Sequence, residues 1–240
     1  MKKHPHIYLL SAMAAVFLGV FSAFADSLFS SYWSTQPQYI ESLGLLAAGL
    51  LGNAAGVWGL SALIASYISA AKSKNFIHGL IISPVFLLCA VFSYYATIQL
   101  ANMRPGAVLL PTMMKWLVVA AVVGTMSGIA GGWLANSQKA WQKILGLVLI
   151  LSYISLDCAL VIRNAGLNPT TLTIVILYVA AGGWLMWRMT KSFRLIAFAG
   201  LVGGFILGAL LLLLPAINEI LIQLQHGSPP PDDTNIIQVN

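Results

Sequence analysis

One acidic side chain lies inside a long apolar segment, and it is the group in this chain best placed to do chemistry. The sequence has six acidic residues, and only Asp157 falls within such a segment. An ionised carboxylate in an apolar interior costs several kcal/mol, so it must face other helices, hold a proton or find a partner. Two interpretations remain open. Asp157 is either a ligand for a proton, a cation or a substrate amine, or a neutral or paired structural carboxyl group.

Three further polar residues are expected near Asp157. Tyr153 lies one helical turn earlier on the same face and is able to donate a hydrogen bond to the carboxyl group. Asn53 and Tyr94 lie at a similar depth in two other apolar segments. We expect these four residues either to line a small polar ligand pocket or to cross-bond neighbouring helices, at about 0.6 kcal/mol for each hydrogen bond.

The sequence lacks the patterns of catalytic and metal sites. It has no nucleophile elbow, no paired acids within one segment and no phosphate-binding loop. The histidines and cysteines have no metal-ligand spacing; they are His4, His6, His78, His226, Cys89 and Cys158. We therefore expect no enzyme, no metal and no cofactor.

The elements that must position these side chains are long apolar helices. The chain is 59% hydrophobic and 8% charged, with a mean hydropathy of +0.88, whereas a soluble domain carries roughly 25% charged residues. The apolar runs lack the alternation of barrel strands, so the sequence predicts an all-α, polytopic transmembrane helical bundle. Seven spans are predicted: Ile7–Ala25, Leu43–Ala70, Phe76–Ala101, Lys115–Ala135, Ile144–Arg163, Leu172–Trp187 and Leu195–Leu214.

The positions of the basic residues predict the orientation of these spans. Nine of the twelve fall in alternate gaps between the apolar runs: Lys2, Lys3, Lys72, Lys74, Lys139, Lys143, Arg188, Lys191 and Arg194. Short loops rich in Lys and Arg stay in the cytoplasm. We therefore expect the amino terminus inside and the carboxyl terminus outside. The basic residues are dispersed, so nucleic acid is not an expected partner.

The first run has two interpretations. Lys2 and Lys3, an apolar stretch and Ala23-Phe24-Ala25 have the form of a signal peptide, and its cleavage would leave six spans. An uncleaved span is favoured, because 19 residues exceed the usual signal core of roughly 7–15. We expect one transmembrane domain over residues 1–225 and a disordered outer tail over 226–240, which contains Pro229-Pro230-Pro231.

Three of the apolar runs carry small residues at four-residue spacing, which lets helix backbones approach closely. These helix-packing residues are Gly52, Gly56, Gly124, Gly128, Gly132, Gly200, Gly204 and Gly208. Packing within one chain is the favoured interpretation, and a homo-oligomer or a membrane partner subunit is the alternative. The second run, at 28 residues, is longer than a perpendicular span, and Gly52–Gly56 is the expected place for a break.

Several short motifs in the first 135 residues resemble a known family. These are Gly49-x-x-Gly52-Asn53-Ala54-Ala55-Gly56-Val57-Trp58, the turn at Lys72–Lys74, Ser93-Tyr94-Tyr95, and the glycines at 124 and 128. Together they resemble a domain-of-unknown-function family of small bacterial multipass membrane proteins. The resemblance implies a place in the inner membrane of a bacterial cell and a first helix that is retained as a span. It implies no catalytic residues.

Two functions are compatible with these features. The first is a small-solute binding or transport subunit that uses the polar region around Asp157 in the outer half of the bilayer. The second is a non-transporting membrane assembly or accessory component that packs through its glycine-rich helix faces. The lipid bilayer is a partner in both, and a small-molecule ligand belongs to the first alone.

Overall fold

The computed structural model describes residues 5–25, 55–101, 103, 109–165 and 169–204. The chain divides into two compact units, Met1–Gly200 and Leu201–Asn240. The helix packing described below concerns the first unit.

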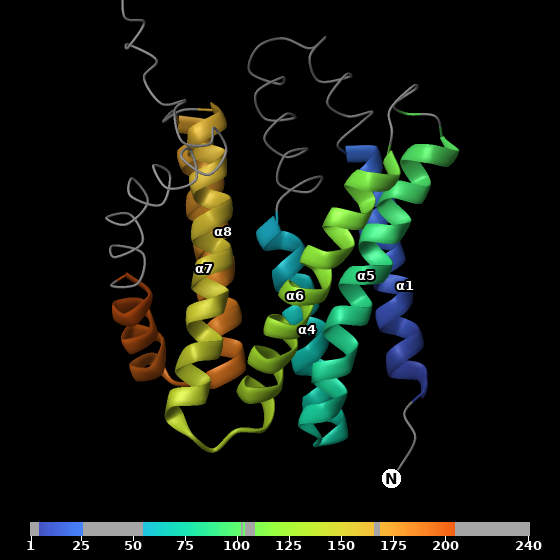
Figure 1. Cartoon of the computed structure of the whole chain (residues 1–240). Coiled ribbons are helices and arrows are strands. Elements are labelled where there is room, and N and C mark those ends of the chain that lie inside the picture. Colours follow the sequence, from blue (N-terminus) through green and yellow to red (C-terminus); the bar gives the residue numbers. More distant parts are fainter. Residues whose placement is uncertain (1–4, 26–54, 102, 104–108, 166–168, 205–240) are drawn as a thin grey trace, which may run out of the picture. The chain divides into compact units, whose positions relative to one another are not determined.

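The described residues form helices and no strand, which confirms the predicted all-helical class. The long helices are α1 (Pro5–Phe24), α4 (Ala55–Ser73), α5 (Phe76–Leu100), α6 (Leu109–Asn136), α7 (Ala140–Ala165) and α8 (Pro169–Thr190) (Figure 1). A shorter apolar helix covers Phe193–Gly204. Within the described part of the chain, five helices are long and apolar enough to cross a bilayer, namely α1, α5, α6, α7 and α8.

These five helices match five of the predicted runs, and some extend beyond them. The run Leu172–Trp187 lies within α8, which has 22 residues and extends beyond the run at both ends. The helix begins at Pro169, a residue favoured at the first helical position, and Arg188 lies in its last turn. The run Leu43–Ala70 is described only from Ala55, as α4, which is not among the five. Part of the last run and the tail at 226–240 lie outside the described residues, as do Gly52, Asn53 and Gly208.

Short turns join neighbouring helices. Between α4 and α5, Lys74 adopts a left-handed backbone with φ 53°, and the Asn75 side chain accepts a hydrogen bond from the backbone N–H of Ile77 at 2.9 Å. Between α6 and α7, Ser137 Oγ accepts from the Lys139 N–H at 3.0 Å. Such short connections leave no room for a crossover, so each turn makes an antiparallel helix pair.

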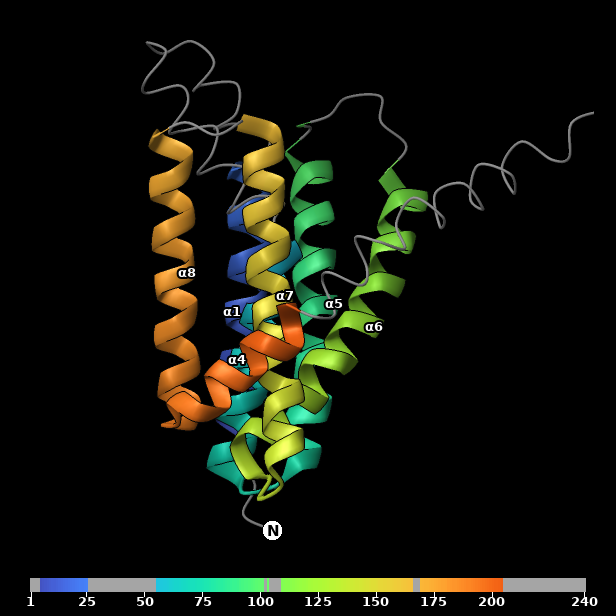
Figure 2. The same cartoon turned by 90° about the vertical axis from the view of Figure 1, so that its left-hand side faces the viewer.

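Helices α5 and α6 pack closely along a glycine stripe, and α6 crosses the neighbouring helices obliquely (Figure 2). The stripe is Gly124, Gly128 and Gly132 of α6, and it faces residues of α5 that are also four apart. A β-carbon would lie 2.5 Å from Pro84 Cα at Gly124, 3.0 Å from Leu80 Cα at Gly128 and 2.5 Å from the Phe76 ring at Gly132. This stripe therefore packs within the chain.

The glycines of the short helix differ from that stripe. No described atom lies within 4 Å of the position that a β-carbon would take at Gly200 or Gly204.

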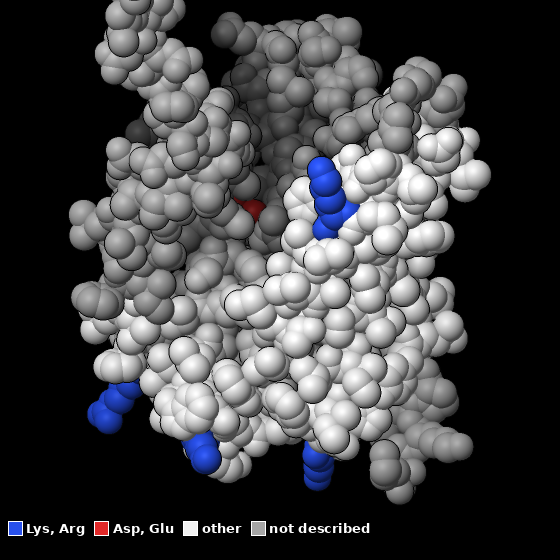
Figure 3. Space-filling model, viewed as in Figure 1, with Lys and Arg blue, Asp and Glu red and all other residues white. Residues whose placement is uncertain are grey.

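Most of the described basic side chains lie at the end of the first unit that carries the α4–α5 and α6–α7 turns, which we call the turn end. Lys115, near the start of α6, and Arg163, in the last turn of α7, lie toward the opposite end. Figure 3 shows blue groups at the lower end of the view and another higher up. Lys72 lies in the last turn of α4 and Arg188 in the last turn of α8, while Lys139 and Lys143 flank the start of α7. The structure therefore has the one-sided distribution of charge on which the orientation was based.

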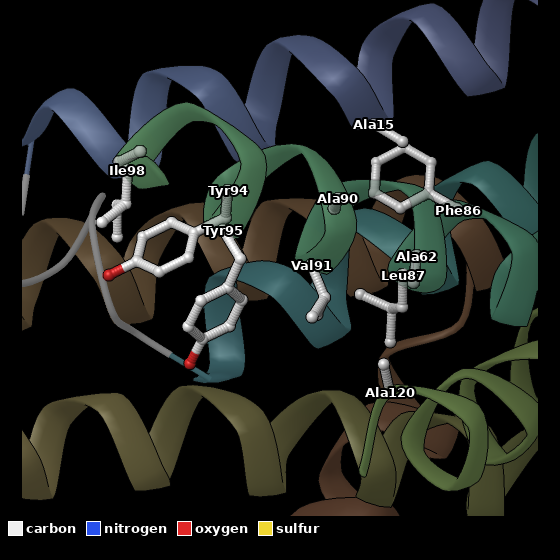
Figure 4. Packing of buried hydrophobic residues seen from close by; sticks show 11 residues of the cluster. Ala15, Ala62, Phe86, Leu87, Ala90, Val91, Tyr94, Tyr95, Ile98 and Ala120 are labelled. Carbon is white, nitrogen blue, oxygen red and sulfur yellow. The ribbon is translucent and has the colours of Figure 1, made fainter. Parts of the chain in front are cut away.

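The buried hydrophobic cluster centres on α5 (Figure 4). Phe86 packs beside Ala15 of α1, and Leu87 lies between Ala62 of α4 and Ala120 of α6. Small residues on the surrounding helices thus meet large residues on α5. This complementarity holds helices together where lipid removes the hydrophobic drive for their association.

Candidate functional site

Asp157 lies on α7, 17 residues after the first residue of that helix, or about 26 Å from its start. Its side chain is 0% exposed. Oδ1 accepts a hydrogen bond from the backbone N–H of Gly56 at 2.9 Å, and Oδ2 accepts one from the Tyr178 hydroxyl at 2.7 Å. The backbone N–H of Val57 also donates to this carboxyl group. Asp157 therefore links α7 to α4 and α8.

The two backbone donors belong to the first turn of the described α4. Hydrogen bonds from such N–H groups to an ionised carboxylate are charge-assisted and stronger than those between neutral groups. The carboxyl group comes from α7, 101 residues away from Gly56. Asp157 therefore joins α7 to the backbone of α4.

Two glycines allow α7 to approach α4 this closely. A β-carbon at Gly56 would overlap the Asp157 carboxyl group and lie 2.5 Å from the Tyr153 carbonyl oxygen. A β-carbon at Gly59 would lie 2.6 Å from Tyr153 Cζ. Gly56 and Gly59 are three residues apart and therefore share one face of α4. The positions of Tyr153 and Asp157 both depend on the absence of side chains on that face.

Tyr153 belongs to a second hydrogen-bonded group beside Asp157. Its hydroxyl lies 2.7 Å from the Ser127 hydroxyl of α6, and Ser127 also donates to the Gly59 carbonyl oxygen at 3.4 Å. Ser127 is 0% exposed and Tyr153 is buried. The sequence suggested that Tyr153 donates to Asp157, but the structure gives that role to Tyr178, because the Tyr153 hydroxyl points to α6.

The charge of this site has no described counterion. Asp157 is the only acidic residue in the described part of the chain, and no ion pair involving it is present there. The basic groups visible in Figure 3 project outward, away from the acidic group. Neutral donors therefore provide all of the described stabilisation of this carboxyl group.

Tyr94 of α5, the other predicted pocket residue within the described part, packs against a different side of α4. Its ring packs edge-on against Trp58 of α4 at 5.8 Å and against Tyr95 at 5.1 Å, and the two tyrosines diverge in Figure 4. At 100° per residue, Trp58 lies roughly 130° around α4 from the Gly56 and Gly59 face. The structure thus groups Asp157 with Tyr153 and places Tyr94 in the aromatic cluster against α5.

Tyr178 is a site residue that was not predicted from the sequence, although a signal for it was present. Helices α7 and α8 are antiparallel, and α7 ends at Ala165 while α8 begins at Pro169, so the midpoint between them in the sequence is Leu167. Asp157 precedes Leu167 by ten residues and Tyr178 follows it by eleven, so both lie at the same depth. Residues equally distant from a tight turn face each other at one level, and a polar pair at that level is a candidate hydrogen bond.

A scan of family models finds none that matches the chain, and neither the curated proteins nor the solved structures contain a match. The resemblance to the family of small bacterial membrane proteins therefore remains a prediction.

Proposed function

We propose that this chain is a multipass protein of the bacterial inner membrane that binds, and as a subunit helps to transport, a small solute at Asp157. The observation that carries the proposal is the fully buried carboxyl group held by donors from α4 and α8. Packing alone does not require such a group, because an apolar side chain of similar volume fills the space without the desolvation cost.

The proposed orientation follows from the charge distribution. The basic side chains at the turn end mark the cytoplasmic face, so α1 and α7 run from inside to outside. With an uncleaved first helix the chain has seven spans. About two thirds of the way along α7, Asp157 then lies in the outer half of the bilayer.

The proposed solute carries an amine or another hydrogen-bond donor. Such a group satisfies Asp157 in place of the Tyr178 hydroxyl, and a cationic group also neutralises the carboxylate. Because Asp157 also holds the start of α4, a solute bound there acts on α4, α7 and α8 together. A site that several helices share is a means of coupling solute binding to helix movement.

The test is a thermal-stability screen of the purified protein against amines, amino acids, sugars, nucleosides and vitamins. We expect at least one compound class to raise the unfolding temperature of the wild type and to have no effect on Asp157→Asn. Ser83→Ala is the matched control, because Ser83 is 0% exposed and its hydroxyl has no hydrogen-bond partner among the described residues. It is expected to respond as the wild type does. A compound that stabilises Asp157→Asn equally would refute the assignment of this site.

A second function, assembly with another membrane subunit or a second copy, is favoured by one observation. The glycine positions 200 and 204 have no described atom within 4 Å, unlike the stripe on α6. If this face binds a partner, Gly204→Leu will abolish a complex seen by native mass spectrometry from membranes, whereas Asp157→Asn will leave it intact.

A further inference from the structure

The described hydrogen bonds of Asp157 come from groups that carry no formal charge. The carboxyl group faces backbone N–H groups from α4 and the Tyr178 hydroxyl from α8, and it interacts electrostatically with the thiol of the next residue, Cys158. Tyr153 is the other titratable side chain on this face of α7, and its hydroxyl is directed to Ser127 of α6. No described Lys, Arg or His takes part, so a change in the charge of Asp157 is not compensated by a described neighbour.

The contact with Tyr178 suits both charge states of the carboxyl group. At 2.7 Å, the Oδ2 to hydroxyl distance is the usual length for an O–H···O hydrogen bond in either direction. When Asp157 is ionised, the tyrosine donates. When Oδ2 carries a proton, that proton is donated to the tyrosine oxygen, and the tyrosine hydroxyl hydrogen rotates away about the C–O bond. The proton that Oδ2 gains comes from water, and no bond between heavy atoms forms or breaks.

We propose that Asp157 is a proton-binding site, in which Oδ2 takes up and releases one proton while Tyr178 changes between donor and acceptor. This proposal rests on the proposed function in one respect. In the proposed transport function, the movement of this proton drives the movement of the solute across the membrane.

The geometry also predicts which contacts weaken when the carboxyl group takes up a proton. Hydrogen bonds to an ionised carboxylate are roughly twice as strong as those between neutral groups. The backbone donors of Gly56 and Val57 belong to α4. Proton uptake therefore weakens the hydrogen bonds between α7 and α4, and proton release restores them.

The experiment is infrared spectroscopy of the full chain in liposomes, titrated between roughly pH 4 and pH 9, around the reference values for carboxyl groups and beyond. We expect a carbonyl band of a protonated carboxyl group that disappears in a single one-proton step as the pH rises. Labelling the four aspartates with ¹³C at the carboxyl carbon shifts the band and assigns it to aspartate. The band is expected to be lost in Asp157→Asn.

A second variant keeps the test valid if Asp157→Asn fails to fold. Tyr178→Phe retains the carboxyl group and removes its hydroxyl partner, so the band is expected to remain while its frequency and titration midpoint shift. Tyr153→Phe, whose hydroxyl contacts Ser127, is expected to change neither. An aspartate band that never titrates, or the absence of any such band in the wild type, would overturn the proposal. Because no solute is added, either result is independent of the solute-binding screen.

Discussion

The carboxyl group of Asp157 exchanges its hydration for hydrogen bonds from α4 and α8. The exchange is incomplete, because an ion moved out of water loses several kcal/mol that neutral donors only partly return. The two tyrosines around this group have different positions. Tyr178 contacts the carboxyl oxygen itself, and Tyr153 contacts a serine that has a second acceptor in the Gly59 carbonyl.

This difference predicts unequal effects of removing the two hydroxyls. Tyr178→Phe leaves a fully buried carboxyl oxygen without its donor, and we expect it to lower the free energy of unfolding by about 1–3 kcal/mol. Tyr153→Phe should lower it less, because Ser127 keeps its bond to Gly59. Reversible unfolding in lipid by steric trapping measures both. Equal losses would show that Tyr178 has no special role at Asp157.

The pair Ser127 and Tyr153 permits a direct measurement of one hydrogen bond between α6 and α7. We expect a double-mutant cycle with Ser127→Ala and Tyr153→Phe to give a coupling of about 0.6 kcal/mol, the mean for hydrogen bonds within membranes. A coupling near zero would show that the two hydroxyls do not bond in the bilayer.

At the level of the helices, glycines determine which elements meet. Gly56 and Gly59 admit α7 to α4, and the stripe on α6 admits α5. These contacts also explain why α4 belongs to the bundle although it is not among the five described helices that are long and apolar enough to cross a bilayer. It is held by backbone approach and buried hydrogen bonds, such as that from Ser66 Oγ to the Gly128 carbonyl oxygen at 3.0 Å.

Alanine at Gly59 is therefore expected to destabilise the protein. The added β-carbon would lie 2.6 Å from the Tyr153 ring and force α4 and α7 apart, at about 1–3 kcal/mol. Gly183→Ala in α8 is the control, because no described atom lies within 4 Å of its β-carbon position. The free energy of unfolding of Gly59→Ala should fall and that of Gly183→Ala should stay within experimental error. Equal values would contradict the close contact.

The sequence was enough to predict the helices and insufficient to predict their neighbours. The length of the apolar runs and their lack of strand alternation predicted the helical class. A helix that spans a bilayer needs about 20 apolar residues in succession, and its backbone polar groups are satisfied within the helix itself. The position of Asp157 along its helix was also predictable, because residue spacing determines it. The direction in which Tyr94 faces was not, because residues at one depth can lie on opposite sides of a helix. Tyr178 shows that pairing across a short turn carries more information than depth alone.

For the molecule as a whole, the proposed orientation in the membrane depends on the basic side chains at one end of the first unit. Lys74 adopts a left-handed backbone at the α4–α5 turn, a conformation usually left to glycine or asparagine. Lys191, after α8, does the same. Placing lysine at such positions costs roughly 1 kcal/mol each, which is consistent with a requirement for positive charge at that face.

The most direct test of the account is the side of the membrane on which the turn end lies. In a background with Cys89→Ala and Cys158→Ala, single cysteines replace Lys74, Lys139 or Lys115, and a membrane-impermeant maleimide is applied to intact spheroplasts and to inverted vesicles. We predict that positions 74 and 139 react only in inverted vesicles and that position 115 reacts only in spheroplasts. Labelling of position 74 or 139 in intact spheroplasts would contradict the orientation and remove Asp157 from the outer half of the bilayer.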